Sequence, residues 1–235
     1  MIIEKFRIGS IPAVLYACDD LNKAKLKQAV IMYHGSSSSK EIHAKELSSL
    51  ADAGFMAIGI DNVGHGERKY PNFEDLFSHD SPNMIENMLK AVNETALELP
   101  SIVEFLDKKF GLQDKSIGIL GISMGALIVY KALSIAKSIR CAVAILGTPK
   151  FCAYETKDYL KSYAKTCLIS LNASKDQYIS NKETIRLHSM LKKRYRTYKE
   201  RFLYKEYPDS GHFMLPEDWE SCWQTSISFL QKNLL

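Results

Sequence analysis

The amino-acid sequence predicts an α/β protein with a mostly parallel central sheet and helices on both faces. Short β-like runs alternate with segments of helical pattern along the chain, which is typical of strand–helix–strand units. The later runs are nearly continuous in apolar residues, as expected of strands that are buried on both faces. The first two runs are more mixed in polarity, which favours an edge hairpin. The predicted strands are 11–18, 29–34, 55–61, 116–121, 141–147, 166–172 and 201–207.

Residues of the capping type predict where three helices begin. Ser38 with Glu41, and Ser180 with Glu183, fit the capping box, in which two side chains satisfy backbone amides that have no helical partner. The Ser-Pro pair at 81–82 predicts a cap followed by the first helical residue. We therefore expect helices to start just after each of these serines.

The longest helical pattern runs from 82 to about 110 and carries apolar residues at helical spacing. Pro100 lies inside it, and a proline within a helix removes a backbone hydrogen bond and clashes with the preceding turn. We expect this segment to be kinked or divided there, with its apolar stripe buried in the core.

Composition narrows the class of protein. The chain has 235 residues, is 46% hydrophobic and carries a net charge of +4, which suits one domain and gives no strong field for nucleic acid. It contains no uncharged apolar run of membrane length, and its N-terminus does not resemble a secretory signal. Its five cysteines show no paired spacing, so we interpret them as reduced and mostly buried thiols. The expectation is a single domain over 1–235, cytoplasmic, without a metal or other cofactor and without a membrane or nucleic-acid partner.

Ser123 lies at a predicted strand-to-helix corner. It is the central residue of a Gly-x-Ser-x-Gly pattern that follows one apolar run and opens a helical one. Gly121 and Gly125 fit this position because a strained turn leaves no room for side chains two residues away on either side. A serine on such a corner is the expected position of a nucleophile.

A serine hydroxyl needs a base to remove its proton during attack, and a histidine is the natural base. Only His212 follows the last predicted strand, where a parallel sheet returns it to the same edge as Ser123. The imidazole in turn needs a carboxylate at its other nitrogen. Asp176 follows the preceding strand and is the favoured carboxylate, with Asp209 and Glu206 as alternatives.

The negative oxygen of a tetrahedral intermediate requires preorganised hydrogen-bond donors. We expect one donor to be the backbone amide of Met124, which follows the nucleophile at the positive end of its helix. The other should come from the loop after the strand 29–34, where Gly35 allows a tight turn. The Ser36 amide is favoured over that of Ser37.

Two further patterns have a functional and a structural interpretation. Aspartate and histidine side chains can bind zinc, as Asp61 and His65 could together with His34 and His79, but the spacing of these residues matches no known set of zinc ligands. Hydrogen bonding by Asp61 and His65 within their own turn is therefore favoured. The basic, aromatic segment 192–199 could contact nucleic acid, but cations are favourable at a helix C-terminus in any case. A solvated helix end is therefore the preferred interpretation.

Taken together, these motifs resemble the α/β-hydrolase superfamily over nearly the whole chain. Within it, the sequence is most similar to small cytoplasmic esterases related to dienelactone hydrolases and to the catalytic domain of prolyl-oligopeptidase-type enzymes. It departs from true dienelactone hydrolases, whose nucleophile is a cysteine, and it has no propeller-sized N-terminal region. The motifs are His-Gly at 34–35, Asp-x-x-Gly-His-Gly at 61–66, Gly-x-Ser-x-Gly at 121–125, Asp176 and Gly-His at 211–212.

The resemblance implies a sheet of about eight strands, a minimal cap and a serine hydrolase of the carboxylesterase type. Only residues 148–165 separate the two strands between which many relatives carry a helical cap. An open pocket would favour short or accessible acyl esters as small-molecule substrates. The alternatives are a thioesterase, a small peptide or amide hydrolase, or a silent binding protein on this scaffold. Predicted pocket residues, for which plain packing is an equal alternative, are Phe73, Phe151, Phe213 and Met214.

Overall fold

A computed structural model of the chain describes residues 1–18, 28–78, 80–112, 117–136, 139–152 and 154–234. Its centre is an eight-stranded sheet in the order β1-β2-β4-β3-β5-β6-β7-β8. The pairs β1/β2 and β2/β4 are antiparallel, and the neighbours from β4 to β8 are parallel. The strands are β1 (Ile2–Ile8), β2 (Ile11–Ala17), β3 (Ala29–Tyr33), β4 (Met56–Ile60), β5 (Ile117–Ile122), β6 (Cys141–Ile145), β7 (Cys167–Ala173) and β8 (Phe202–Tyr207).

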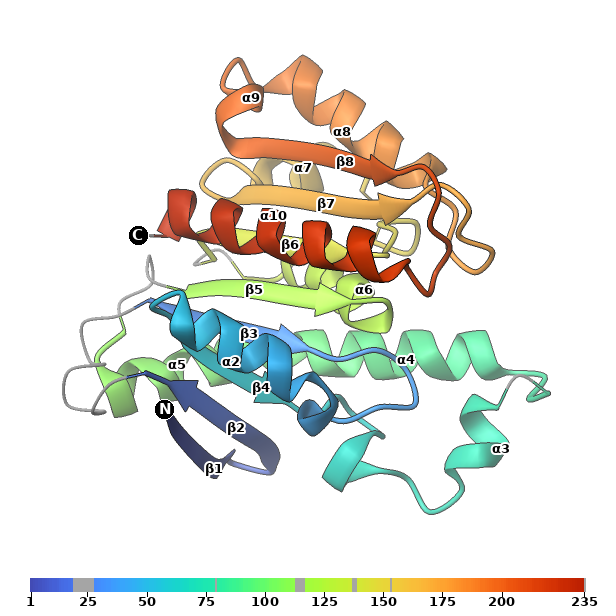
Figure 1. The fold of residues 1–235 in the computed structure, drawn as a ribbon. Helices are drawn as coiled ribbons and strands as arrows, with labels where there is room; N and C mark the ends of the chain where they lie inside the picture. Colours follow the sequence, from blue (N-terminus) through green and yellow to red (C-terminus); the bar gives the residue numbers. More distant parts are fainter. Residues whose placement is uncertain (19–27, 79, 113–116, 137–138, 153, 235) are drawn as a thin grey trace.

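Helices cover both faces of the sheet (Figure 1). Buried residues of α2 (Ala44–Asp52) and α10 (Pro216–Leu234) form a core with one face. The other face packs against α4 (Met84–Leu97), α5 (Leu99–Phe110), α6 (Met124–Ala132), α7 (Lys157–Ser162) and α8 (Lys182–Arg194). The short elements are η1 (Lys40–His43), η2 (Gly66–Arg68), α3 (Phe73–Phe77) and α9 (Tyr198–Arg201). This arrangement confirms the predicted fold class.

The N-terminal edge differs from the prediction. The edge hairpin is formed by β1 and β2, whereas β3, one of the two runs assigned to it, lies between β4 and β5. β1 is missing from the predicted strands, although its residues alternate between partly buried and exposed as a half-covered edge strand should. Three charged residues, Glu4, Lys5 and Arg7, interrupt the strand and concealed it from a search for apolar runs.

The predicted helix starts are wrong, and the predicted break is confirmed. After Ser38 the chain forms the 3-10 helix η1 before α2 begins, and α8 begins after Asn181 with no side-chain cap. The Ser-Pro pair at 81–82 lies in a turn before α4, whose cap is Asn83. In each case one or more further residues separate the serine from the first residue of the α-helix, from one residue at Ser180 to five at Ser38. Pro100 lies in the first turn of α5 and so divides the long helical pattern into α4 and α5.

Candidate active site

The loops at the carboxyl edge of the parallel strands bring the predicted site residues together. Ser123 follows β5 and joins it directly to α6 with φ +56° and ψ −116°, a strained conformation for a residue with a side chain. Its amide donates a hydrogen bond of 2.9 Å to the carbonyl of Ile145, which holds the corner against β6. Packing in the loop and the helix thus keeps the backbone in a conformation that it would not adopt alone.

The need for two glycines at this corner is confirmed. A Cβ on Gly121 would lie 2.1 Å from the carbonyl oxygen of Gly125, and a Cβ on Gly125 would lie 2.2 Å from that of Tyr33. Both contacts are with backbone atoms, which cannot move aside. The elbow therefore depends on close approach of three backbone segments, namely the end of β3, the end of β5 and the first turn of α6.

Ser123, His212 and Asp176 form a continuous hydrogen-bonded chain. The Ser123 Oγ lies 2.9 Å from His212 Nε2, and His212 Nδ1 lies 2.8 Å from Asp176 Oδ2. An ionised carboxylate can only accept, so the proton of the neutral imidazole sits on Nδ1 and Nε2 is left to accept from the serine hydroxyl. The Asp176 side chain is 1% exposed, that of His212 is 13% exposed, and Ser123 is partly exposed. Solvent therefore reaches the hydrogen-bonded triad at its serine end.

The two alternative carboxylates have other partners. Asp209 pairs with Lys175 at 3.1 Å on the surface, and Glu206 accepts a hydrogen bond from the Asn181 side chain. Asp176 uses its second oxygen, Oδ1, to accept from the backbone amides of Tyr178 and Ile179 at 2.8 and 2.9 Å. Of the three predicted carboxylates, the structure brings Asp176 to His212.

The predicted donors for an oxyanion lie on either side of Ser123. Met124 is the first residue of α6, so its amide is one of those with no carbonyl partner within the helix. Across from it, Gly35 approaches Ser123 so closely that a Cβ built on it would lie 3.7 Å from the Ser123 Cβ. Ser36 follows Gly35 and is exposed, while Ser37 turns the chain with φ +55°.

A buried ion-pair network, which sequence analysis did not identify, holds the end of this loop. Lys40 is 1% exposed at its side chain, and its ammonium group contacts Asp61 at 2.9 Å, Glu67 at 2.7 Å and Glu41 at 3.0 Å. Burial by itself would lower the pKa of Lys40, but hydrogen bonds to these carboxylates raise it above its ordinary value. The backbone amide of Lys40 also donates to Asp61 Oδ1 at 2.8 Å. No local pattern marks this lysine for burial, since Asp61 and Glu67 come from a different loop.

His34 and His65 are structural in this arrangement. His34 Nε2 accepts from the amide of Asn62 at 3.0 Å, while its Nδ1 lies 2.7 Å from the Gly35 carbonyl oxygen. Burial lowers the pKa of His34 to about 4, and burial also lowers the pKa of His65. Both imidazoles are therefore neutral at pH 7. Within the part of the chain that the structure describes, no group of three or more His, Cys, Asp or Glu side chains could hold a metal ion, and His79 lies outside that part.

The predicted pocket residues are dispersed. Phe73 is buried in α3 and borders a hollow of about 480 Å³ that Ser37 also lines, whereas Phe151 borders a cavity of about 160 Å³ with Leu127 of α6. Met214 is partly buried against the core under α10. Of the four, only Phe213 packs beside His212, with ring centroids 5.8 Å apart.

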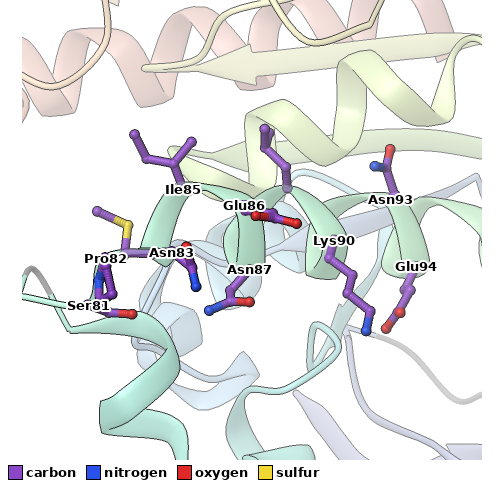
Figure 2. Close-up of a pocket in the computed structure, with 11 residues that line it drawn as sticks. Ser81, Pro82, Asn83, Ile85, Glu86, Asn87, Lys90, Asn93 and Glu94 are labelled. Carbon is purple, nitrogen blue, oxygen red and sulfur yellow. The ribbon is translucent and has the colours of Figure 1, made fainter.

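A hollow of about 1060 Å³ lies along the first turns of α4 and does not belong to this constellation (Figure 2). Ile85 and Lys90 project to opposite sides of the helix, so the space surrounds an exposed helix more than it encloses a ligand. None of the predicted site residues lines it. We therefore place the chemistry at the strand ends and not at this hollow.

The basic segment 192–199 uses its aromatic rings for packing. The Tyr195 hydroxyl donates to the Leu160 carbonyl at 2.6 Å, and the Tyr198 hydroxyl lies 2.8 Å from His188 Nδ1. Three basic residues occupy the last turn of α8, where they complement the helix dipole. These contacts favour the interpretation of the segment as the end of a helix over its interpretation as a nucleic-acid-binding patch. Among the described helices, none is long and apolar enough to cross a membrane.

Comparisons with known proteins show the family and the fold. A sequence model of the serine aminopeptidase S33 family matches residues 24–207. Esterase YjfP of Escherichia coli is 26% identical over 149 residues, which are 63% of this chain and 56% of the relative, so the match spans about half of that protein. The crystal structure of TT1662 from Thermus thermophilus superposes with a TM-score of 0.78 at 20% identity and 98% coverage of both chains. A putative dienelactone hydrolase from Klebsiella pneumoniae gives a TM-score of 0.70 at 16% identity and 97% coverage of both chains.

Proposed function

Because the chain belongs to the serine aminopeptidase S33 family of α/β-hydrolases, we propose that it is a serine hydrolase that cleaves carboxylic esters through an acyl-enzyme. The observation that carries the proposal is the hydrogen-bonded chain from Ser123 through His212 to Asp176. We also propose that residues 1–235 form one domain, in keeping with a single sheet that is covered on both faces.

The proposed reaction has two halves. His212 Nε2 takes the proton of the Ser123 hydroxyl as its oxygen attacks the carbonyl carbon, and the amides of Met124 and Ser36 stabilise the resulting oxyanion. When the carbonyl re-forms, the bond to the alcohol oxygen breaks and that oxygen takes the proton from His212. Water then attacks the acyl-enzyme with His212 again as base, and the acid leaves as Ser123 regains its proton. Throughout, Asp176 holds Nδ1 and stabilises the imidazolium.

Two observations favour esters with short acyl groups. The curated relative is named an esterase. Leu127, which lines the cavity of about 160 Å³, lies one helical turn after Ser123. Helical side chains lean towards the N-terminal end of their helix, which here is the Ser123 end. A space of that size supports a small acyl group better than a long chain.

The decisive experiment is labelling of the purified protein with a fluorophosphonate, together with turnover of short p-nitrophenyl esters. We expect the wild-type protein to be labelled and active, and Ser123→Ala to be neither. A folded protein that is not labelled and hydrolyses none of these esters would instead be a silent binding protein on the same scaffold.

Amide hydrolysis is the second candidate function, because the matching family is described as a family of aminopeptidases, which cleave amide bonds. The same catalytic groups can attack esters, thioesters and amides, which differ mainly in the leaving group that His212 must protonate. Turnover of a matched acetyl ester, thioester and anilide would rank them. We expect the ester to be cleaved fastest, and faster cleavage of the anilide would assign an amidase.

A further inference from the structure

Two aromatic side chains lie beside His212 and face solvent. Phe213 is 85% exposed and Tyr178 is 62% exposed, which is unusual for rings of this size because exposure leaves their apolar surface in water. The Tyr178 and Phe213 rings each meet the imidazole edge to face, with centroids 5.3 and 5.8 Å away, and their own centroids are 6.4 Å apart. We call this pair the aromatic rim.

The loops that carry the site residues also position the aromatic rim. Phe213 directly follows His212, and the amide of Tyr178 donates to Asp176 Oδ1 at 2.8 Å. One carboxylate therefore orients the imidazole with one oxygen and the Tyr178 turn with the other. The backbone of both rim residues is therefore tied to the residues that position His212, whose Nε2 faces Ser123.

The proposed reaction decides which part of a substrate meets these rings. His212 must give its proton to the oxygen of the departing alcohol, so that oxygen has to lie beside Nε2 in the transition state. The carbon skeleton attached to it then extends past the side chains that flank His212. The exposed charges of these two loops, Lys175 and Asp209, pair with each other at 3.1 Å, and the Asp176 side chain is buried against His212, so the loop surface offers no unpaired charge to an ionic group.

We propose that Tyr178 and Phe213 form the leaving-group subsite and select esters of aromatic or bulky apolar alcohols. This inference rests on the function proposed above. A substrate ring can stack on or meet the edge of either side chain, and contact between rings contributes beyond the area that it buries. The subsite favours such alcohols over small ones because binding covers apolar surface that is otherwise exposed to water.

The test compares kcat/KM for benzyl acetate with kcat/KM for ethyl acetate, which share the acyl group. We expect the wild-type enzyme to prefer the benzyl ester. Phe213→Ala should lower the benzyl-to-ethyl ratio about tenfold, and Tyr178→Ala about threefold. Tyr178→Phe, which keeps the ring, should retain the wild-type ratio. Any general disturbance of His212 lowers both rates and cancels in the ratio.

The matched control is Leu203→Ala, which removes an exposed apolar side chain from β8 and should leave the ratio unchanged. Hydrolysis of both esters with the wild-type ratio in Phe213→Ala and Tyr178→Ala would overturn the subsite while sustaining the hydrolase. An equal fall in Leu203→Ala would overturn it as well. Absence of turnover of both esters, together with absence of Ser123 labelling, would refute the hydrolase proposal and this subsite with it.

Discussion

Two histidines at the same edge of the sheet have opposite surroundings. His212 meets a carboxylate at Nδ1 and a hydroxyl at Nε2, and part of its side chain reaches solvent. His34 is buried, has a backbone carbonyl at Nδ1, and accepts from a backbone amide at Nε2. His34 therefore has no free nitrogen for a second proton, whereas in the proposed reaction His212 takes a proton from Ser123 and Asp176 balances the charge. The partners, and not the residue type, determine which imidazole can do acid–base chemistry.

The two buried aspartates show the same contrast. Asp61 accepts from the backbone and ammonium groups of Lys40 and from the amide of Glu67, so it is committed to holding the loop together. Asp176 divides its oxygens between His212 and the turn that carries Tyr178. The contacts of Asp61 stabilise the fold, whereas those of Asp176 orient His212 for the proposed reaction. Substitutions that separate stability from turnover test this division.

The largest effect is expected at Ser123. Ser123→Ala removes the attacking oxygen and should lower kcat for short esters by at least about 10⁴-fold, because the remaining groups cannot form an acyl-enzyme. Steady-state hydrolysis measures the loss, and circular dichroism should show an unchanged fold. Retention of more than a few per cent of wild-type turnover would mean that another residue is the nucleophile.

Asp176→Asn should come next, lowering kcat by about 10³- to 10⁴-fold. An asparagine can present an N–H to Nδ1 and so favours the tautomer that cannot accept from Ser123. Asp209→Asn is the matched control, since Asp209 pairs only with an exposed lysine in the structure and should leave kcat within about twofold. Loss of turnover in Asp209→Asn alone would reassign the carboxylate.

The buried network should affect stability more than any surface pair. Asp61→Asn leaves the Lys40 ammonium short of a buried partner, and we expect the free energy of unfolding to fall by about 3 kcal/mol or more. Urea denaturation at pH 7 measures this change. Asp158→Asn breaks the exposed pair with Lys161, which water screens, and should leave the free energy of unfolding nearly unchanged. Equal costs for the two variants would contradict the role assigned to Asp61.

The smallest effect is a pH dependence of stability from buried histidines. Burial lowers the pKa of His188 to about 3 and that of His34 to about 4, while in the unfolded chain both titrate near 6.5. Below about pH 6.5 the unfolded state binds protons that the folded state does not, so stability decreases as the pH falls towards 4. The slope should be shallower in His188→Gln by up to about 1.4 kcal/mol per pH unit. Urea unfolding at pH 7, 6 and 5 measures how the free energy of unfolding changes with pH in the wild-type protein and in His188→Gln. Identical slopes for the two proteins would show that His188 takes up its proton in the folded state.

The order of the elements and the elbow could be predicted because they depend on neighbours in the chain. Apolar runs indicate buried strands, and glycines on either side of Ser123 indicate a turn whose backbone must approach other backbone closely. The helix starts failed because serines before a helix also suit the turns that precede it, as at Ser81, whose carbonyl accepts from the amide of Met84 at 3.2 Å. β1 was missed because an edge strand needs only alternate apolar residues.

By itself, the sequence determined the α/β class, the strained corner at Ser123 and the chain order of serine, aspartate and histidine. Only the tertiary structure decided that Asp176, and not Asp209 or Glu206, reaches His212, that Lys40 is buried among three carboxylates, and that Tyr178 and Phe213 flank the imidazole. The physical reason is that periodicity and turn chemistry act over a few residues. These contacts join loops far apart in the sequence, whose paths depend on the packing of the whole sheet edge.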